Sequence, residues 1–148
     1  MQSLNLPSFE HKLRNAEGKL WIFDIIRKKY VVLTPEEWVR QHFINYMITE
    51  LKYPRTLLRV EGGLTYNKLS KRSDIVVYDR DGKPWMVVEC KAPGYDLSQA
   101  TLHQATAYNA ALRARFLVIS NGFRHYCAST DWENGVTKVL PAMPAFET

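Results

Sequence analysis

The chain lacks several features that would assign it to a specialised class of protein. It has only two cysteines among 148 residues, Cys90 and Cys127, and they match neither a zinc-binding spacing nor a disulfide framework. Apolar runs of transmembrane length and the charged-then-apolar layout of a signal peptide are both missing. Internal repeats, a glycine-rich phosphate-binding loop and a serine-hydrolase elbow are missing too. We therefore expect a soluble cytoplasmic protein, without membrane contact and without a bound nucleotide cofactor.

The composition is that of one ordinary globular domain. Hydrophobic residues make up 46% of the chain, and its length suffices to bury a core without disulfides. Lys and Arg outnumber Asp and Glu by 20 to 15, which gives a net charge of +5. This excess is compatible with a polyanionic partner but does not require one. We expect an irregular N-terminal arm over residues 1–18, a single domain over 19–140 and an irregular tail over 141–148.

The first predicted helix has a well-marked beginning. Thr34 suits the N-cap, Pro35 suits the first helical position, and Glu37 stands three residues after the cap as in a capping box. Apolar residues then recur at helical spacing as far as Leu51. The box alone accounts for Glu37, without a metal ion.

The remaining pattern predicts a mixed α/β fold. A second helix is expected from an N-cap at Asp96 to about Arg113, in a stretch rich in Ala and Leu. Runs rich in β-branched and aromatic residues predict strands at 20–26, 30–33, 57–61, 75–78, 85–88, 115–120, 123–128 and 136–140. This order of elements favours an α/β sandwich with a mixed central sheet and two main helices.

Candidate functional residues gather around one predicted hairpin. Two apolar strands flank Asp79–Gly82, an Asp-Gly turn, so Asp74 and Glu89 are expected at the same end of neighbouring strands. Because strand side chains alternate, Glu89 and Lys91 share a face. Two carboxylates and the backbone carbonyl of Cys90 are oxygen donors of the kind that Mg²⁺ prefers. The plainer interpretation is a solvated Glu-Lys pair beside an Asp that only begins its strand.

Basic residues stand just ahead of Asp74. We expect them to favour the anionic form of this carboxylate or to bind a phosphodiester, although a solvated loop explains them as well. These residues are Lys68, Lys71 and Arg72.

Asp74 is followed fifteen positions later by Glu89-Cys90-Lys91. This motif resembles that of PD-(D/E)XK nucleases. More narrowly, four stretches in this order resemble the N-terminal nuclease domain of type I restriction enzyme R subunits. They are Leu33–Gln41, Asp74–Asp79, Val88–Pro93 and Gln104–Asn109.

The resemblance implies a restriction-endonuclease-like fold and hydrolysis of DNA with Mg²⁺, for which Mn²⁺ could substitute. It implies catalytic roles for five residues: Asp74, Glu89, Lys91, Gln104 and Tyr108. The implied metal ligands are Asp74, Glu89 and the Cys90 carbonyl, with Glu37 in the outer coordination sphere. The expected DNA contacts are Lys68, Lys71, Arg72 and Arg40.

The implied partners are DNA and either a second copy of the chain or separate motor and specificity subunits. A restriction or mobile-element role follows from the same resemblance. The alternative is a DNA-binding or assembly module that keeps the fold without cutting. Metal binding discriminates between the two, because a binding-only module has no need to chelate the ion.

Overall fold

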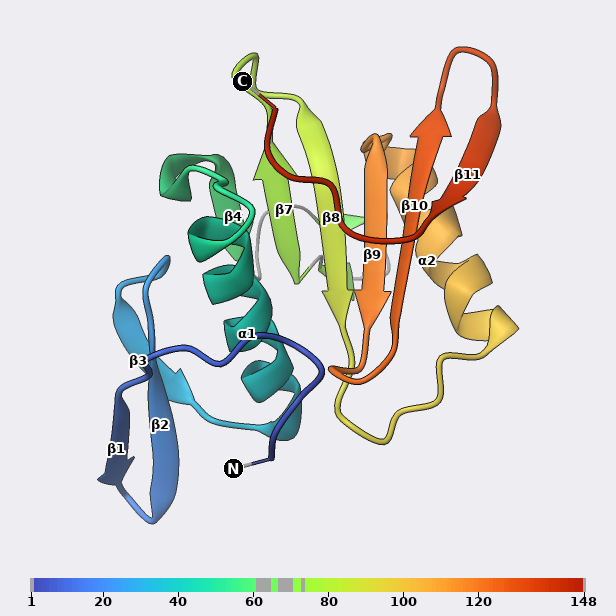
Figure 1. Ribbon diagram of the computed structural model, residues 1–148. Helices are drawn as coiled ribbons and strands as arrows, with labels where there is room; N and C mark the ends of the chain where they lie inside the picture. Colours follow the sequence, from blue (N-terminus) through green and yellow to red (C-terminus); the bar gives the residue numbers. More distant parts are fainter. Residues whose placement is uncertain (1, 61–64, 67–70, 73, 148) are drawn as a thin grey trace.

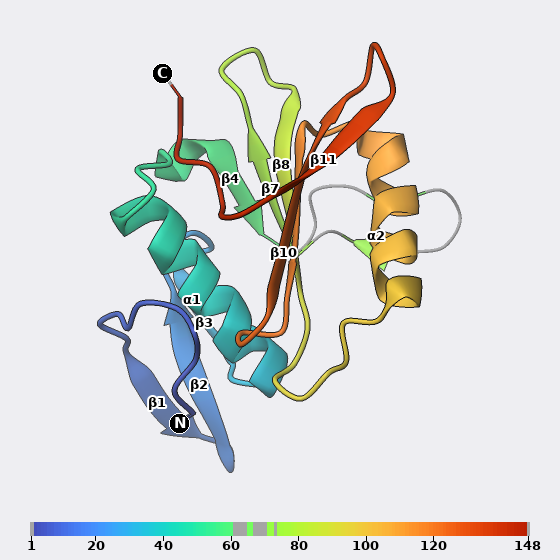
Figure 2. The same ribbon diagram turned by 45° about the vertical axis from the view of Figure 1, so that its right-hand side comes forward.

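The computed structural model describes residues 2–60, 65–66, 71–72 and 74–147, and it shows a three-layer α/β/α sandwich with a small additional sheet (Figures 1 and 2). The two helices lie on opposite faces of the main sheet, and the additional sheet lies beside the first helix. The helices are α1 (Pro35–Thr49) and α2 (Gln99–Leu112), with a 3₁₀ turn, η1 (Arg55–Leu57). The strands of the main sheet are β4 (Leu58–Val60), β7 (Ile75–Tyr78), β8 (Pro84–Cys90), β9 (Phe116–Ser120), β10 (His125–Asp131) and β11 (Val136–Leu140).

The main sheet is mixed, as the sequence predicts. Its strand order is β11-β10-β9-β8-β7-β4, in which β8 and β9 run parallel and the other neighbours run antiparallel. β8 is one of the two central strands of this order, and α1 and α2 cover its two faces. This burial explains the nearly unbroken apolar run from Trp85 to Val88, which an edge strand would not need. A short hairpin of β5 (Thr65–Tyr66) and β6 (Lys71–Arg72) precedes β7.

Alternation along β8 divides the apolar residues into two cores. Val88 belongs to the cluster that includes Phe43 and Met47 of α1. Val87, its neighbour, belongs to the cluster that includes Ala105 of α2. Ile119 of β9 is paired with Glu89 in register and packs in the α2 cluster, so Glu89 projects toward α2.

A side-chain N-cap marks the start of each helix, and the N-cap of α2 differs from the one predicted from the sequence. Thr34 accepts a hydrogen bond from the Glu37 backbone N–H at 3.0 Å, as predicted. For α2 the prediction of Asp96 as N-cap is wrong. Ser98 caps this helix by accepting from the Thr101 N–H at 3.3 Å, and the helix begins one residue later. Both residue types suit an N-cap, so only the course of the loop decides between them.

The additional sheet consists of β1 (Leu13–Ala16), β2 (Lys19–Asp24) and β3 (Lys29–Val32), paired antiparallel in that order. The expectation of an irregular arm over residues 1–18 is therefore wrong for β1. This strand has mostly exposed side chains, so it carries no alternating apolar pattern that the sequence could reveal. Its turn, Glu17-Gly18, has φ of 55° and 72°, the positive values that a two-residue hairpin turn requires.

No helix in the described part of the chain is long and apolar enough to cross a membrane.

His42 of α1 makes stability sensitive to pH. Its ring is buried against Phe9 and Trp38, at centroid distances of 4.8 and 4.5 Å. Burial lowers the pKa of His42, and the nearby His11 lowers it further, although the hydrogen bond to the Trp38 carbonyl opposes this. The unfolded chain therefore binds more protons just below the ordinary pKa of 6.5, and the free energy of unfolding should fall as the pH drops through this range.

Urea unfolding at about pH 7.5 and about pH 5.5 tests this prediction, and His42→Gln should lose less stability between the two than the wild type does. His103→Gln is the matched control, because His103 is exposed on α2. An unchanged pH dependence in His42→Gln would contradict the assignment.

Candidate active site

The structure brings Asp74 and Glu89 to the same end of the β7–β8 hairpin. Ile75 of β7 is paired with Val88 of β8. Because the two strands run antiparallel, Asp74, which precedes Ile75, lies opposite Glu89, which follows Val88. Asp74 Oδ2 accepts a hydrogen bond of 2.6 Å from the backbone N–H of Cys90. This bond holds the Asp74 carboxylate against the peptide group that joins Glu89 to Cys90.

Glu89 and Lys91 form a partly enclosed ion pair. Lys91 Nζ lies 3.9 Å from Glu89 Oε1 and 5.1 Å from the centre of the Tyr95 ring. The Lys91 and Glu89 side chains are only 19% and 14% exposed, so the interpretation of a fully solvated pair does not apply. The Lys91 N–H donates to the Ser120 carbonyl at 2.7 Å, which fixes the backbone here to the end of β9.

Arg40 connects Asp74 to the first helix. Its Nη2 lies 2.8 Å from Asp74 Oδ1, and its Nη1 lies 2.6 Å from Glu37 Oε1. Burial alone would lower the pKa of Arg40, but the charges of Asp74 and Glu37 outweigh burial and raise it. Arg40 is only 4% exposed. The structure therefore does not support Arg40 as a DNA contact, because its guanidinium is directed into the protein and bonded to carboxylates.

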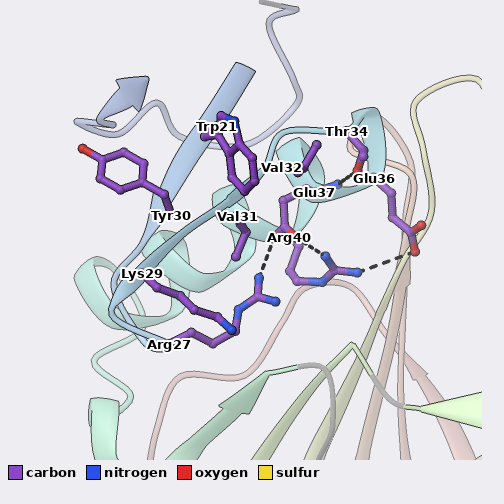
Figure 3. A pocket seen from close by; sticks show the side chains of 10 residues that line it. All are labelled: Trp21, Arg27, Lys29, Tyr30, Val31, Val32, Thr34, Glu36, Glu37 and Arg40. Atoms are coloured by element: carbon purple, nitrogen blue, oxygen red, sulfur yellow. Dashed lines mark hydrogen bonds and ion pairs between the residues drawn. The ribbon is translucent and has the colours of Figure 1, made fainter. Parts of the chain in front are cut away.

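The carboxylate of Glu37 is held from two sides. Glu37 Oε2 accepts from Arg27 Nη2 at 3.1 Å, and Oε1 accepts from Arg40 Nη1 (Figure 3). Glu37 Oε2 also accepts from Gln41 Nε2 at 3.0 Å. Glu37 is 5% exposed, and the helix cap uses only its backbone N–H. A role of Glu37 in the outer coordination sphere stays a prediction, and Arg40 is the group that joins it to Asp74.

Asp24 continues this network into the small sheet. It is fully buried, and its carboxylate accepts hydrogen bonds from the Arg27 Nε at 2.8 Å and the Gln41 Nε2 at 2.9 Å. Burial would raise the pKa of Asp24, but the backbone N–H of Arg27 and the Gln41 amide outweigh burial and lower it. The pKa of Arg27 is raised, because Asp24 and Glu37 outweigh the opposing effect of burial. Acidic and basic side chains thus alternate along this network from β2 to β7, in the order Asp24, Arg27, Glu37, Arg40 and Asp74.

Gln104 and Tyr108 lie one turn apart on α2, as predicted. The Gln104 Nε2 donates to the Tyr108 hydroxyl at 3.3 Å, and Gln104 is exposed. Both come from the helix that covers the face toward which Glu89 projects. The bonds described for Gln104 join it to Tyr108 and not to Glu89 or Lys91, so a catalytic role for the pair stays a prediction.

The basic residues ahead of Asp74 are only partly covered by the structure. Lys68 lies outside the described residues. Lys71 and Arg72 form β6, whose backbone pairs with β5, but their side chains are not described. The prediction that these residues contact DNA is therefore untested.

The oxygen donors at the hairpin end are compatible with a hard divalent cation. Each Asp74 oxygen accepts one hydrogen bond, and a carboxylate oxygen has room for a second interaction. Among the described residues, no three His, Cys, Asp or Glu side chains are grouped to hold a metal ion. A site here would thus rely on Asp74, Glu89, the Cys90 carbonyl and several waters, which suits Mg²⁺ better than zinc.

A pocket of about 560 Å³ opens between β3 and the start of α1 (Figure 3). Its lining includes the charged side chains of Arg27, Lys29, Glu37 and Arg40. Small-molecule sites are mostly apolar, so this pocket is a poor match for a small-molecule enzyme. It reaches Arg40 and hence the guanidinium that binds Asp74.

Sequence reasoning did not identify Asp24, Arg27 and Gln41 as part of this region. One signal was present, because Asp24 interrupts the apolar run 20–26, and a charge inside such a run needs a partner when buried. Its partner Gln41 is 17 residues away on a helix, which no local pattern indicates.

The sandwich, with two acids and a lysine at one end of adjacent central strands, defines a restriction-endonuclease-like domain. A family model described as the type I restriction enzyme R protein N terminus (HSDR_N) matches residues 35–144. The chain belongs to this family.

One similar solved structure is a fragment of a protein described as an HsdR subunit of a type I restriction enzyme from Vibrio vulnificus YJ016. It is 27% identical in sequence, with a TM-score of 0.38. The match covers 60% of this chain but only 16% of that one, so this chain spans a small part of its relative. A comparison with curated proteins finds no match.

Asp24→Asn tests how much the buried network stabilises the fold. The substitution removes the charge that opposes Arg27 and should lower the free energy of unfolding by about 3 kcal/mol, as expected when one partner of a buried ion pair is removed. Urea denaturation measures the change. Asp81→Asn is the matched control, because Asp81 is exposed in the β7–β8 turn and Asn-Gly suits that turn equally well. Equal effects of the two substitutions would show that the network contributes nothing.

Proposed function

We propose that this domain hydrolyses phosphodiester bonds of DNA with the help of Mg²⁺, as part of a restriction-related system. The observation that carries the proposal is the placement of Asp74 beside the Glu89-Cys90-Lys91 segment, fixed by the 2.6 Å bond to the Cys90 N–H. Membership in the R-subunit family supports the restriction context. Separate motor and specificity subunits are the partners that this context suggests.

The residues divide the chemistry between them. Asp74, Glu89 and the Cys90 carbonyl would hold the cation. The cation would supply positive charge to offset the charge that develops on the phosphate in the transition state, and it would favour deprotonation of the attacking water. Lys91, held between Glu89 and Tyr95, would position this water and stabilise the same charge. As water attacks phosphorus, the bond from phosphorus to one sugar oxygen breaks, and that oxygen takes up a proton.

Arg40 has a supporting role in this proposal. By binding Asp74 Oδ1 it directs the carboxylate toward the Cys90 peptide, while Oδ2 is held by the N–H of that peptide. The same ion pair also favours the second candidate function, a DNA-binding or assembly module without cleavage. A buried pair of Asp74 with Arg40 is satisfied electrostatically even without a cation. Metal binding and cleavage must therefore be measured separately.

Lys91→Gln separates catalysis from metal binding. The variant should bind Mn²⁺ as the wild type does, because Lys91 is not a ligand, but its cleavage rate should fall by about 100-fold or more. Calorimetric titration with Mn²⁺ and cleavage of plasmid and linear DNA measure the two properties. Lys83→Gln, at the exposed far end of the same hairpin, is the control. Unaltered cleavage by Lys91→Gln would remove Lys91 from the mechanism.

Glu89→Gln tests the metal site itself. Removal of one carboxylate should weaken Mn²⁺ binding by at least about tenfold and abolish cleavage. Asp74→Asn should do the same, but it also breaks the pair with Arg40, so its unfolding curve must be measured alongside. A wild-type protein that binds DNA yet takes up no Mn²⁺ would favour the binding module instead.

A further inference from the structure

The small sheet has one face turned away from α1. Ile22 and Asp24 of β2 are fully buried, and Asp24 bonds to Gln41 of α1. Because strand side chains alternate, Trp21 and Phe23 project from the opposite side, which we call the outer face. The outer face is thus free of the helix that covers the inner one.

Cations and aromatic rings are interleaved on the outer face. Arg14 is paired in register with Trp21, and Phe23 is paired with Tyr30. The Lys12 carbonyl accepts from the Phe23 N–H at 3.0 Å, which extends the pairing by one step. The outer face accordingly carries three exposed cations and three half-buried rings: Lys12, Arg14 and Lys19, and Trp21, Phe23 and Tyr30.

The rings hold two of these cations without neutralising them. The Arg14 guanidinium lies 4.8 Å from the centre of the Tyr30 ring, and Lys12 Nζ lies 5.7 Å from that of Phe23. A cation–π contact restrains the side chain but leaves its charge and N–H donors in place. Among the described residues, no carboxylate forms an ion pair with Lys12, Arg14 or Lys19. Arg27 and Arg40, by contrast, are matched with acids.

The small sheet also carries most of the excess charge of the chain. Residues 11–33 contain six Lys or Arg and two Asp or Glu, a net charge of +4, whereas the whole chain has +5. One of these two acids, Asp24, is buried on the inner side. Uncompensated cations at several points of one surface are the electrostatic feature expected for a polyanion partner.

This surface borders the pocket that reaches Arg40. Trp21 and Tyr30 line the pocket between β3 and α1, together with Arg40. Figure 3 shows Tyr30 directed to the side of β3 away from Arg40, and Val31 directed toward it. The pocket therefore lies at the edge of β3, where it is lined by side chains of the outer face and by Arg40, and the Arg40 guanidinium in turn binds Asp74.

We propose that the outer face of the β1–β3 sheet binds the phosphate backbone of duplex DNA, with Lys12, Arg14 and Lys19 as the contacting residues. The inference rests on the proposed function for its choice of DNA as the polyanion. It extends that function to a segment that precedes residues 35–144, the part matched by the family model. Contacts of this kind position the duplex and carry no sequence specificity.

The test is duplex binding measured by fluorescence anisotropy in EDTA, so that neither metal nor cleavage contributes. The triple variant Lys12→Gln, Arg14→Gln, Lys19→Gln should bind at least about tenfold more weakly at moderate salt. Its slope of log affinity against log salt should be less steep by about 2 to 3, since each phosphate that is no longer neutralised lowers the slope by about one unit. Arg14→Lys, which keeps the charge, should bind nearly as the wild type does.

The control variant replaces one Arg and two Lys elsewhere: Arg55→Gln, Lys83→Gln and Lys138→Gln. These residues are exposed, and both triple variants have a net charge of +2, so any difference reflects position and not total charge. Far-UV circular dichroism checks the fold of each variant. Equal weakening by the two triple variants would overturn the proposal, as would a wild-type protein that does not bind duplex DNA. Unchanged binding by the outer-face variant would also overturn it and leave an acidic protein as the partner of this face.

The outcome is independent of the proposed hydrolysis. If the outer-face variant loses DNA binding while the wild type never cleaves, the proposed DNA-binding surface is supported and the proposed hydrolysis is contradicted. If the wild type cleaves DNA and the outer-face variant binds and cleaves it equally well, the proposed hydrolysis is supported and the proposed DNA-binding surface is contradicted.

Discussion

The guanidinium of Arg40 is the interaction on which the rest of the site depends. It is buried between α1 and the main sheet and bonds to Glu37 on the helix and to Asp74 next to β7. A buried cation is costly unless it is matched by acids, and here both acids are supplied within hydrogen-bonding distance. Arg40 therefore fixes where the first helix lies relative to the strand end that presents Asp74.

The alternation of charge from Asp24 to Asp74 links the two sheets of the domain. Arg27 is shared between Asp24 and Glu37, as Arg40 is shared between Glu37 and Asp74. Each acid thus faces a cation, and the network can be buried without a large unpaired charge. Through it the small sheet, which carries most of the net positive charge of the chain, is connected to Asp74.

The sequence predicted the hairpin that carries the site but not the network beneath it. Asp74 and Glu89 could be placed together because strand alternation and the Asp-Gly turn are local rules. The mixed sandwich followed in the same way from the order of the elements. The partner of Arg40 could not be predicted, because it depends on how α1 packs on the sheet. The strand β1 was missed for a related reason, since it is held by backbone pairing and its side chains are exposed.

The central claim is that Asp74 and Glu89 hold a divalent cation next to Lys91. A crystal structure of the protein soaked in Mn²⁺, with anomalous diffraction to locate the ion, tests this claim most directly. The account predicts an anomalous peak between the two carboxylates, beside the carbonyl of Cys90. A fully occupied ion elsewhere, or no ion with the Asp74–Arg40 pair unchanged, would contradict it.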